Sequence, residues 1–275
     1  MNEDYIGFSE ADVARLWDAA ASSWTQQVRK ALDVYREHFN NPAFFEFLGP
    51  LKGKRVLDAG CGEGYNTRIM ARMGAKVTGV DISAKLIERA QKEERRQPLG
   101  IKYIVASFTN LSRFKDTSFD VVVSTMALGD SPNLAKAIRE FFRVLSSGGE
   151  LIFSIQHPCF VTKGLSWVRD ETEKDIKLTV SHYFDNRPRV EEWKFTYAPP
   201  NAKPFVTPAF YRTLSQVFKT LISAGFVLKD LEEPRPPAGA CKRFPKMAKW
   251  RKHAALFLYI RCQKPDLEQK RRRSG

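Results

Sequence analysis

Short apolar segments alternate with amphipathic ones through the middle of the chain, a pattern that indicates alternating strands and helices. The expected strands lie at 54–59, 76–80, 101–105, 119–124 and 149–155, and the expected helices at 65–73, 84–96 and 133–146. The continuous valine run at 121–123 is typical of a parallel strand buried on both faces. Because crossovers between parallel strands are right-handed, helices should cover both faces of the sheet. The pattern predicts an α/β fold.

The residues before this alternation are expected to be helical. Residues 9–40 place several apolar side chains on one side of a helix, namely Val13, Leu16, Trp17, Ala20 and Trp24. Ser9 is positioned to cap the helix start, with Asp12 three residues later. Pro42 opens a second, short helix. We therefore expect an N-terminal helical cap over residues 1–50.

The alternation breaks at about 157–207, inside a larger domain expected at 51–265. Two alternating segments, 176–184 and 190–198, flank turn residues at 185–188 and predict a β-hairpin. The insertion is rich in aromatic residues and follows the fifth strand, at the edge of the sheet where such folds bind ligands. We predict a lid over a substrate, and a hairpin with its own small core is the alternative. The closing elements are a helix at 208–224 and strands at 226–231 and 254–262.

A glycine-rich turn joins the first strand to the first helix. The string VLDAGCGEG at 56–64 contains Gly60, Gly62 and Gly64, and the second strand ends in KVTGVDIS with Asp81. Glycine lets a ligand approach the backbone closely, and a helix N-terminus favours an anionic group. A carboxylate at a strand end accepts hydrogen bonds from ribose hydroxyls. This frame predicts an adenosine-containing cofactor, with a tight turn that holds no ligand as the alternative.

The strings VLDAGCGEG and VTGVDIS resemble the first two motifs of the class I S-adenosylmethionine-dependent methyltransferases, in particular the small-molecule, type 11-like group. Tyr65 stands where a dinucleotide site has its third glycine, which disfavours a dehydrogenase. The string SFDVVVSTMALGD at 118–130 is similar to the family's fourth-strand motif, and the resemblance covers about 54–262. It implies S-adenosyl-L-methionine as cofactor. It also implies a Rossmann-like sheet of seven mostly parallel strands, the last of them antiparallel.

The resemblance also implies which residues bind the cofactor. The full set is Trp24, Asp58, Gly60, Cys61, Gly62, Asp81, Ile82, Ser107, Phe108, Thr125 and Met126. Asp81 would bind the ribose, and Phe108 would pack on the adenine. Ser107 stands where the family often has an Asp for the adenine amino group, so this contact departs from the pattern. Trp24 would cover the sulfonium, a cation–π contact worth ~1–2 kcal/mol when desolvated, or it is a core residue of its helix.

His157 is the first candidate for a catalytic residue. It follows the fifth strand in SIQHPCF, and its ordinary pKa suits a general base that takes a proton from an acceptor hydroxyl or amine. The alternative is a histidine that fixes the lid by hydrogen bonds. Tyr183 in the expected hairpin is a second candidate, and His182, Tyr211 and Arg212 are weaker ones.

Composition limits the class of protein. The 275 residues are 43% hydrophobic and 28% charged, and the longest apolar run, at 254–260, is too short to span a bilayer. The N-terminus is acidic and lacks the apolar segment of a signal peptide. The four cysteines have no CxxC spacing, which predicts reduced thiols and no metal site. We expect a cytoplasmic protein.

Positive charge is concentrated at the C-terminal end. The net charge is +14, and residues 235–275 hold 13 Lys and Arg against two acids. Such a segment can be a solvated end, attract an anionic substrate or bind nucleic acid. Residues 266–275 are expected to form a disordered basic tail.

The leading hypothesis is a methyltransferase that acts on a small, apolar or aromatic molecule. An RNA or protein methyltransferase that uses the basic segment is the second. The string STMALGD disfavours it, because enzymes that methylate nucleobase amines have an NPPY-like string there. A non-catalytic module that only binds the cofactor is the third.

Overall fold

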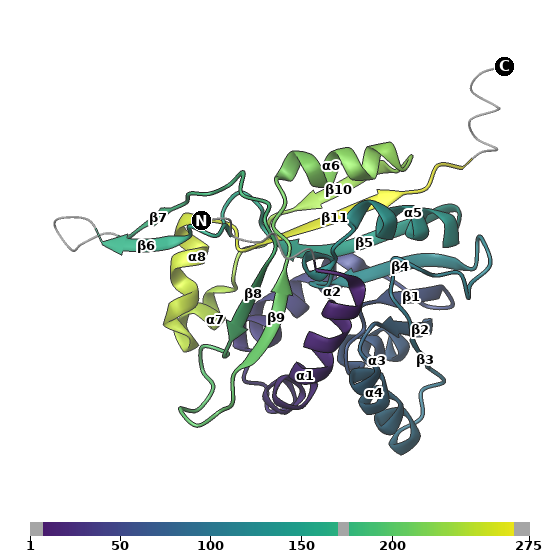
Figure 1. Cartoon of the computed structure of the whole chain (residues 1–275), viewed down its shortest axis with the longest axis horizontal. Coiled ribbons are helices and arrows are strands. Elements are labelled where there is room, and N and C mark those ends of the chain that lie inside the picture. The colour runs from purple at the N-terminus through teal and green to yellow at the C-terminus, as the bar shows by residue number, and fades with distance from the viewer. Residues whose placement is uncertain (1–7, 170–175, 267–275) are drawn as a thin grey trace.

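Seven strands form the central sheet, in the order β10-β11-β5-β4-β1-β2-β3 (Figure 1). The computed structural model describes residues 8–169 and 176–266. The strands are β1 (Arg55–Ala59), β2 (Lys76–Asp81), β3 (Lys102–Val105), β4 (Phe119–Thr125), β5 (Leu145–Gln156), β10 (Val227–Glu232) and β11 (Phe257–Gln263). Strands β1 to β5 pair in parallel, and β11 is antiparallel to both of its neighbours. The expected mostly parallel sheet with an antiparallel last strand is confirmed.

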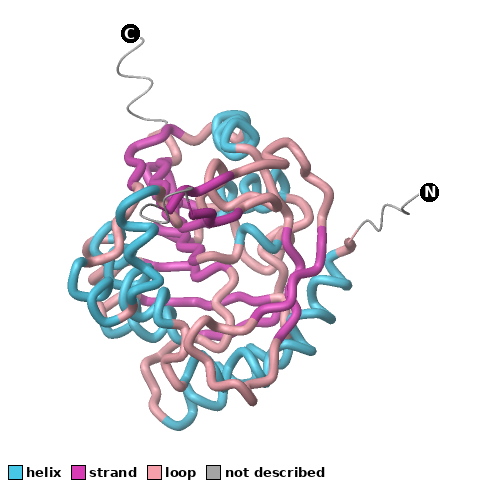
Figure 2. Tube along the Cα trace, turned by 90° about the vertical axis from the view of Figure 1, so that its left-hand side faces the viewer, coloured by secondary structure: helices cyan, strands magenta, loops and turns pink. Residues whose placement is uncertain are grey.

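Alternate side chains of each central strand enter different cores, as the two-residue period of a strand requires. Leu57 and Val122 pack with one set of helices, and Val56 and Val121 pack with the other. The first set is α5 (Leu134–Val144) and α6 (Leu214–Ser223), and the second is α2 (Asn41–Leu48), α3 (Tyr65–Arg72) and α4 (Ala84–Arg96). The strands therefore run through the middle of the molecule with helices outside them (Figure 2).

The N-terminal helix α1 (Glu10–Arg29) begins where the sequence predicts. The Ser9 hydroxyl accepts from the Asp12 amide at 3.2 Å, and the Asp12 carboxylate accepts from the Ser9 amide at 3.0 Å, which forms a capping box. The helix does not continue to residue 40, because Ala31 adopts a positive φ of 53°. A short π-helical turn, η1 (Arg36–Asn40), then leads into α2.

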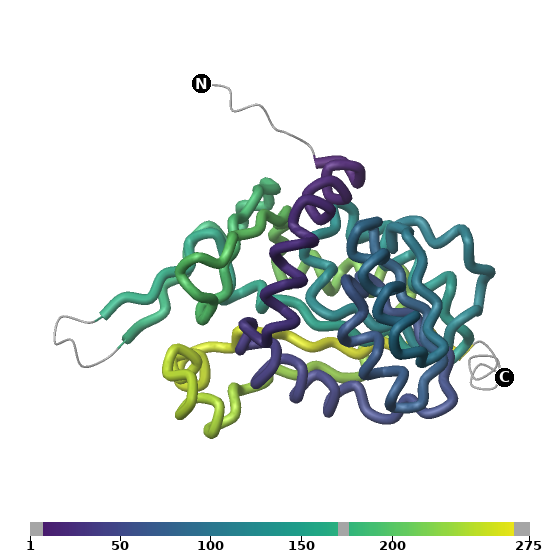
Figure 3. Tube along the Cα trace, turned by 90° about the horizontal axis from the view of Figure 1, so that it is seen from below, coloured from purple at the N-terminus to yellow at the C-terminus, as the bar shows by residue number. Residues whose placement is uncertain are grey.

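Helix α1 lies between the insertion and α4 (Figure 3). On one side the Gln27 amide donates to the Lys203 carbonyl at 2.8 Å, and the Ser23 hydroxyl donates to the Pro204 carbonyl at 3.2 Å. On the other side Asp18 accepts from the Ser83 hydroxyl at 2.6 Å. The helix therefore joins the insertion to the second βα unit of the sheet.

The insertion after β5 contains two antiparallel pairs, and the expected pairing of 176–184 with 190–198 is wrong. Strand β6 (Ser166–Arg169) pairs with β7 (Ile176–Thr179), which confirms a β-hairpin after β5. Strand β8 (Arg189–Trp193) pairs instead with β9 (Phe205–Ala209).

Aromatic contacts accompany both of these pairs. On β6, Trp167 packs edge-on against Trp250, with ring centroids 5.0 Å apart. On β9, Phe205 is buried and lies 5.3 Å from the ring of Phe195. Each pair is therefore held by an aromatic contact that the local alternation of the sequence does not reveal.

Two further segments differ from the sequence prediction. The start of the expected helix at 208–224 belongs to β9, and α6 begins only at Leu214, where Thr213 and Gln216 form a capping box. The basic segment between β10 and β11 was not predicted to be helical. It contains α7 (Ala238–Arg243), the 3₁₀ turn η3 (Pro245–Met247) and α8 (Ala248–His253), which lies beside the β6–β7 hairpin (Figure 1). Of the expected tail, residues 267–275 lie outside the described part of the chain.

Gly64 combines a positive φ with a close neighbour, whereas Gly53 has only the positive φ. The φ angles are 87° for Gly64 and 78° for Gly53. A Cβ added to Gly64 would lie 2.8 Å from the Tyr103 ring, whereas a Cβ added to Gly53 would have no neighbour within 4 Å. We expect Gly53→Ala to cost about 1–2 kcal/mol from backbone strain alone. Gly64→Ala should cost about 1–3 kcal/mol more, because it also overpacks the site. Urea unfolding of both variants measures this, and equal losses would contradict the assigned contact.

Candidate active site

A cavity of about 370 Å³ lies at the carboxyl edge of the sheet, enclosed by α1 and by residues of β8 and β9. Its size is in the range of about 300–1,000 Å³ that is typical of small-molecule sites. All eleven residues predicted to bind the cofactor line this cavity. They come from α1, the β1–α3 loop and the ends of β2, β3 and β4, so the fold brings distant parts of the sequence to one site.

The glycine loop is shaped to let a ligand lie against the backbone. A Cβ on Gly60 would collide with Ala127, and a Cβ on Gly62 would meet the Trp24 ring at 3.3 Å. The amides of Gly60 and Cys61 donate to the Val80 carbonyl, at 2.8 and 3.0 Å. These two hydrogen bonds hold the loop against β2. The amides of Gly60 and Cys61 are therefore already used within the protein, and a ligand would contact the loop through the space left by its missing side chains.

Asp81 fixes the end of β2 to the glycine loop. One carboxylate oxygen accepts from the Gly62 amide and the other from the Ser83 amide, both at 2.8 Å. Burial raises the pKa of Asp81 to about 6, although these two hydrogen bonds oppose the rise. Because a carboxylate oxygen can accept more than one hydrogen bond, each oxygen keeps acceptor capacity for a ligand hydroxyl.

Asp58 lies deeper, at the end of β1. Its carboxylate accepts from the Thr67 hydroxyl at 2.6 Å. Burial raises the pKa of Asp58 to about 7, the Thr67 bond opposes the rise, and the nearby Asp81 adds to it. Two buried carboxyl groups beside one loop make this end of the cavity attractive to a ligand that carries positive charge.

The end of β4 contributes a polar group that lacks a partner. The Thr125 hydroxyl is buried, and it has no hydrogen-bond partner among the described residues. The next residue, Met126, has a positive φ of 59°, and its amide donates to the Ser154 carbonyl at 3.0 Å. An unpaired buried hydroxyl is costly, and strained backbone at such an edge is typical of a ligand site. Both observations fit a polar ligand that lies across the end of β4.

Aromatic and hydroxyl groups complete the predicted set. Trp24 packs edge-on against Trp17, with ring centroids 5.9 Å apart. The Ser107 hydroxyl accepts from the Thr109 amide at 3.1 Å, so it is partly engaged within its own loop. The Thr109 hydroxyl also donates to Glu10 in the first turn of α1. The cap helix is therefore tied to the loop that follows β3.

The part of the cavity under β8 and β9 is aromatic, and its lining includes Trp193, Phe195, Phe205 and Phe210. Glu191 also lines it and accepts from the Tyr211 hydroxyl at 2.5 Å. The sequence placed Trp193 and Phe195 among the aromatic residues of a lid over the substrate, but it did not indicate Phe205 or Phe210. The density of aromatic residues in the insertion could be read from the sequence. The β8–β9 pairing that brings them together could not.

The catalytic candidates His157 and Tyr183 lie outside the cavity lining. The His157 ring is buried, with Nε2 2.7 Å from a Glu233 carboxylate oxygen and Nδ1 accepting from the Cys159 amide at 3.2 Å. Burial lowers the pKa of His157, and Glu233 opposes this shift. The Tyr183 hydroxyl accepts from the Leu214 amide at 2.9 Å. Both side chains thus hold the insertion in place, and we assign neither a catalytic step.

The position of His157 has a simple cause. Phe153 and Ile155 on β5 line the cavity, and strand alternation would place residue 157 with them. The strand ends at Gln156, however, and His157 opens a turn in which its carbonyl accepts from the Val161 amide at 2.8 Å. The turn removes the side chain from the face that alternation predicts.

No group of three or more His, Cys, Asp and Glu side chains among the described residues is arranged to hold a metal ion. Within the same residues, no helix combines the length and the apolar character needed to cross a bilayer.

Comparisons with known proteins agree on one family. The sequence profile of the family described as "Methyltransferase domain" matches residues 57–153. A Haemophilus influenzae protein described as uncharacterized is 30% identical over 215 residues, which cover 76% of this chain and 81% of that protein. The crystal structure of an S-adenosylmethionine-dependent methyltransferase from Mesorhizobium loti is 26% identical, with a TM-score of 0.66, and the match covers 81% of this chain and 96% of that one.

One similar protein has a more specific name. A ubiquinone biosynthesis O-methyltransferase from Nitrosococcus oceani is 33% identical over 158 residues, which is 56% of this chain. The match spans 65% of that protein's length, slightly less than two thirds.

The raised pKa values of Asp58 and Asp81, about 7 and about 6, predict how stability depends on pH. Between about pH 4, where these groups titrate in the unfolded chain, and about pH 7, the folded protein binds more protons. The free energy of unfolding should therefore fall as pH rises, by up to about 1.4 kcal/mol per pH unit for each group. Asp58→Asn should reduce this slope, as measured by denaturant unfolding at several pH values.

Asp120→Asn is the matched control. Arg55 lowers the pKa of Asp120 by a hydrogen-bonded ion pair, so its titration affects stability below about pH 4 and not in this window. Equal slopes for the wild type and Asp58→Asn would refute the assigned pKa of Asp58.

Proposed function

The chain belongs to the class I S-adenosylmethionine-dependent methyltransferases, and we propose that it transfers a methyl group to a small, apolar or aromatic acceptor. One observation carries the proposal: a single cavity contains both the eleven predicted cofactor residues and the aromatic residues of the insertion. A cofactor held along the sheet edge would leave the space under β8 and β9 for the acceptor.

The enclosure of the cavity favours a small acceptor. Helix α1 lies across it, bonded to the β8–β9 connection through Gln27 and to the α4 N-terminus through Asp18. A polymer would have to separate these contacts to reach the end of β4. The similar Nitrosococcus protein is named for O-methylation in ubiquinone biosynthesis, which supports a small aromatic acceptor and oxygen as the methylated atom.

The residues of the chain have to hold and orient the two reactants. When bound, the cofactor supplies an activated methyl group on a positively charged sulfur. In this proposal Asp81 binds its ribose, Asp58 and the glycine loop lie along its methionine portion, and Trp24 covers the sulfur. Orientation of the two reactants is the main source of rate for such a transfer.

The basic segment gives little support to a nucleic-acid acceptor. None of the described residues from 235 to 253 lines the cavity, although this range contains Lys242, Arg243 and Lys246. A methylated nucleotide would have to reach past the insertion to the cavity. We therefore propose a small molecule, and not RNA, as the acceptor.

The function is tested with the full chain, S-adenosylmethionine carrying a labelled methyl group, and two sets of acceptors. A panel of phenols and aromatic amines should accept label with release of S-adenosylhomocysteine, whereas tRNA should not. Label in tRNA at a rate above that of every small molecule would overturn the proposed acceptor class.

Asp81→Ala should weaken the binding of S-adenosylhomocysteine by at least about tenfold, because it removes the ribose acceptor and frees the Gly62 and Ser83 amides. Calorimetric titration measures this. Asp120→Ala removes a carboxylate that lies outside the cavity lining and should bind as the wild type does. An Asp81→Ala variant with unchanged affinity would contradict the ribose contact.

A further inference from the structure

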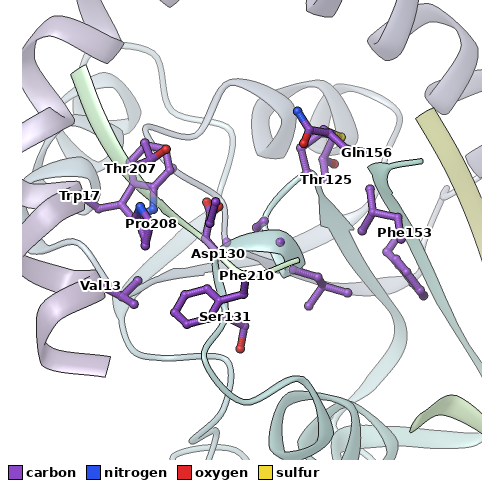
Figure 4. Close-up of a pocket in the computed structure, with 18 of the residues that line it drawn as sticks. Val13, Trp17, Thr125, Asp130, Ser131, Phe153, Gln156, Thr207, Pro208 and Phe210 are labelled. Atoms are coloured by element: carbon purple, nitrogen blue, oxygen red, sulfur yellow. The ribbon is translucent and has the colours of Figure 1, made fainter. Parts of the chain in front are cut away.

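Asp130 is a carboxylate in the cavity that sequence reasoning did not select. It is the last residue of the 3₁₀ turn η2 (Leu128–Asp130), which directly follows β4. Leu128 is 1% exposed and anchors the turn in the core. The Asp130 carboxyl group points into the open middle of the cavity, with Thr207 and Pro208 on one side and Thr125 and Gln156 on the other (Figure 4). The turn therefore presents a carboxyl group beside the end of β4.

No described cation forms an ion pair with Asp130. The charge of Arg212 acts on the pKa of Asp130. The Arg212 guanidinium, however, donates to the carbonyls of Leu128 at 3.3 Å, Phe210 at 3.2 Å and Ser131. These bonds hold the segment around Asp130 in place. Three donors of Arg212 are thus used by backbone carbonyls, and Asp130 has a side-chain hydrogen bond from Trp17 and no ion pair among the described residues. Its carboxyl group keeps acceptor capacity for a ligand.

The surroundings of Asp130 are mostly apolar. Val13, Trp17 and Phe210 line the cavity around it (Figure 4). Burial raises the pKa of Asp130 well above its ordinary value, the charges of Asp81 and Glu191 add to the rise, and Trp17 and Arg212 oppose it. A carboxyl group kept without a cation in such a place is costly to the fold and is typical of a functional site.

A second buried group points to the same conclusion. Ser131 follows Asp130, is 2% exposed and lines the cavity, and its hydroxyl has no hydrogen-bond partner among the described residues. By contrast, Glu191 is engaged by the Tyr211 hydroxyl at 2.5 Å and by Arg189 at 2.5 Å. Of these two carboxyl groups in the acceptor half of the cavity, Asp130 is the one left without an ion pair.

We propose that Asp130 is the general base that accepts the proton of a phenolic hydroxyl on the acceptor, an inference that rests on the proposed function. The hydroxyl donates a hydrogen bond to the ionised carboxylate. As the acceptor oxygen bonds to the methyl carbon, the carbon–sulfur bond breaks and its electron pair stays on sulfur. The hydroxyl proton passes to Asp130, which later releases it to solvent. A methyl ether, a neutral thioether and one proton are the products.

The charges of the cavity agree with this class of acceptor. A carboxylate or phosphate on the acceptor would meet Asp130 and Glu191. Of the arginines beside them, Arg212 donates to backbone carbonyls and Arg189 is paired with Glu191. A neutral phenol instead provides a donor for Asp130 and an apolar ring for the aromatic lining. The structure thus favours an uncharged hydroxylated aromatic molecule over an anionic one.

Binding without turnover gives the first test. The probe is 4-nitrocatechol, whose absorbance reports its ionisation, added to the full chain saturated with S-adenosylhomocysteine. An ionised Asp130 should hold the probe in its protonated form, because ionising both groups would place two negative charges together. The ionisation of the bound probe should therefore occur about one pH unit or more higher in the wild type than in Asp130→Asn. An identical titration in both proteins would overturn the proposal.

Turnover gives the second test, with catechol and 4-nitrocatechol as acceptors. Asp130→Asn should lower kcat for catechol by about 10²–10⁴-fold. The loss should be much smaller for 4-nitrocatechol, whose more acidic hydroxyl needs a base less. The wild-type rate should rise with pH as Asp130 ionises, and the variant should lack this rise. Equal losses for both acceptors would assign Asp130 a structural role and refute the inference.

A matched variant and a binding control distinguish a wrong base, a wrong acceptor class and a wrong function. Asp120→Asn removes a carboxylate outside the cavity lining and should keep the wild-type ratio of catechol to 4-nitrocatechol turnover. S-adenosylhomocysteine affinity should be the same in Asp130→Asn as in the wild type. Wild-type protein that binds S-adenosylhomocysteine but methylates neither phenol would overturn the acceptor class alone. Wild-type protein that does not bind S-adenosylhomocysteine would overturn the proposed function itself.

Discussion

The carboxylate of Asp81 holds together the parts from which the site is built. Its two oxygens accept from Gly62 in the first loop and from Ser83 at the start of α4, so the two neighbouring strand ends share one rigid connection. The Ser83 hydroxyl in turn donates to Asp18 on α1. A continuous series of short hydrogen bonds thus connects the glycine loop to helix α1, which lies over the cavity.

The insertion adds an aromatic wall to the cavity at the edge of the sheet. Strands β8 and β9 and the residues next to them place four aromatic side chains in the cavity lining, and α1 is hydrogen-bonded to the β8–β9 connection. Carboxyl groups with raised pKa values line the cavity. Of its two lining arginines, Arg212 donates to backbone carbonyls and Arg36 is paired with Glu37. Such a site has the character expected for a cationic cofactor and an uncharged acceptor.

Local patterns predicted the frame well because each of its parts is encoded within a short window. Valine runs identify the parallel strands, and the glycine spacing with Asp81 identifies the loop and strand end that meet in the cavity. The same reasoning misplaced His157, since a turn after Gln156 interrupts the alternation that would have directed its side chain inward. It also paired the wrong strands of the insertion, where β6 packs through Trp167 on the distant Trp250 and β8 pairs with β9.

The sequence by itself determined the alternating strands and helices of the central sheet, the family, and a set of predicted cofactor residues that all line the cavity. These features depend on periodicity and on motifs, which are local properties of the chain. The tertiary structure alone decided which groups face the acceptor. Asp130 is a candidate because it has no ion-pair partner among the described residues. Apolar side chains of α1 and of the segment after β9 also surround it. Burial and pairing of charge are properties of the assembled fold, because they arise only when segments distant in sequence close around one group.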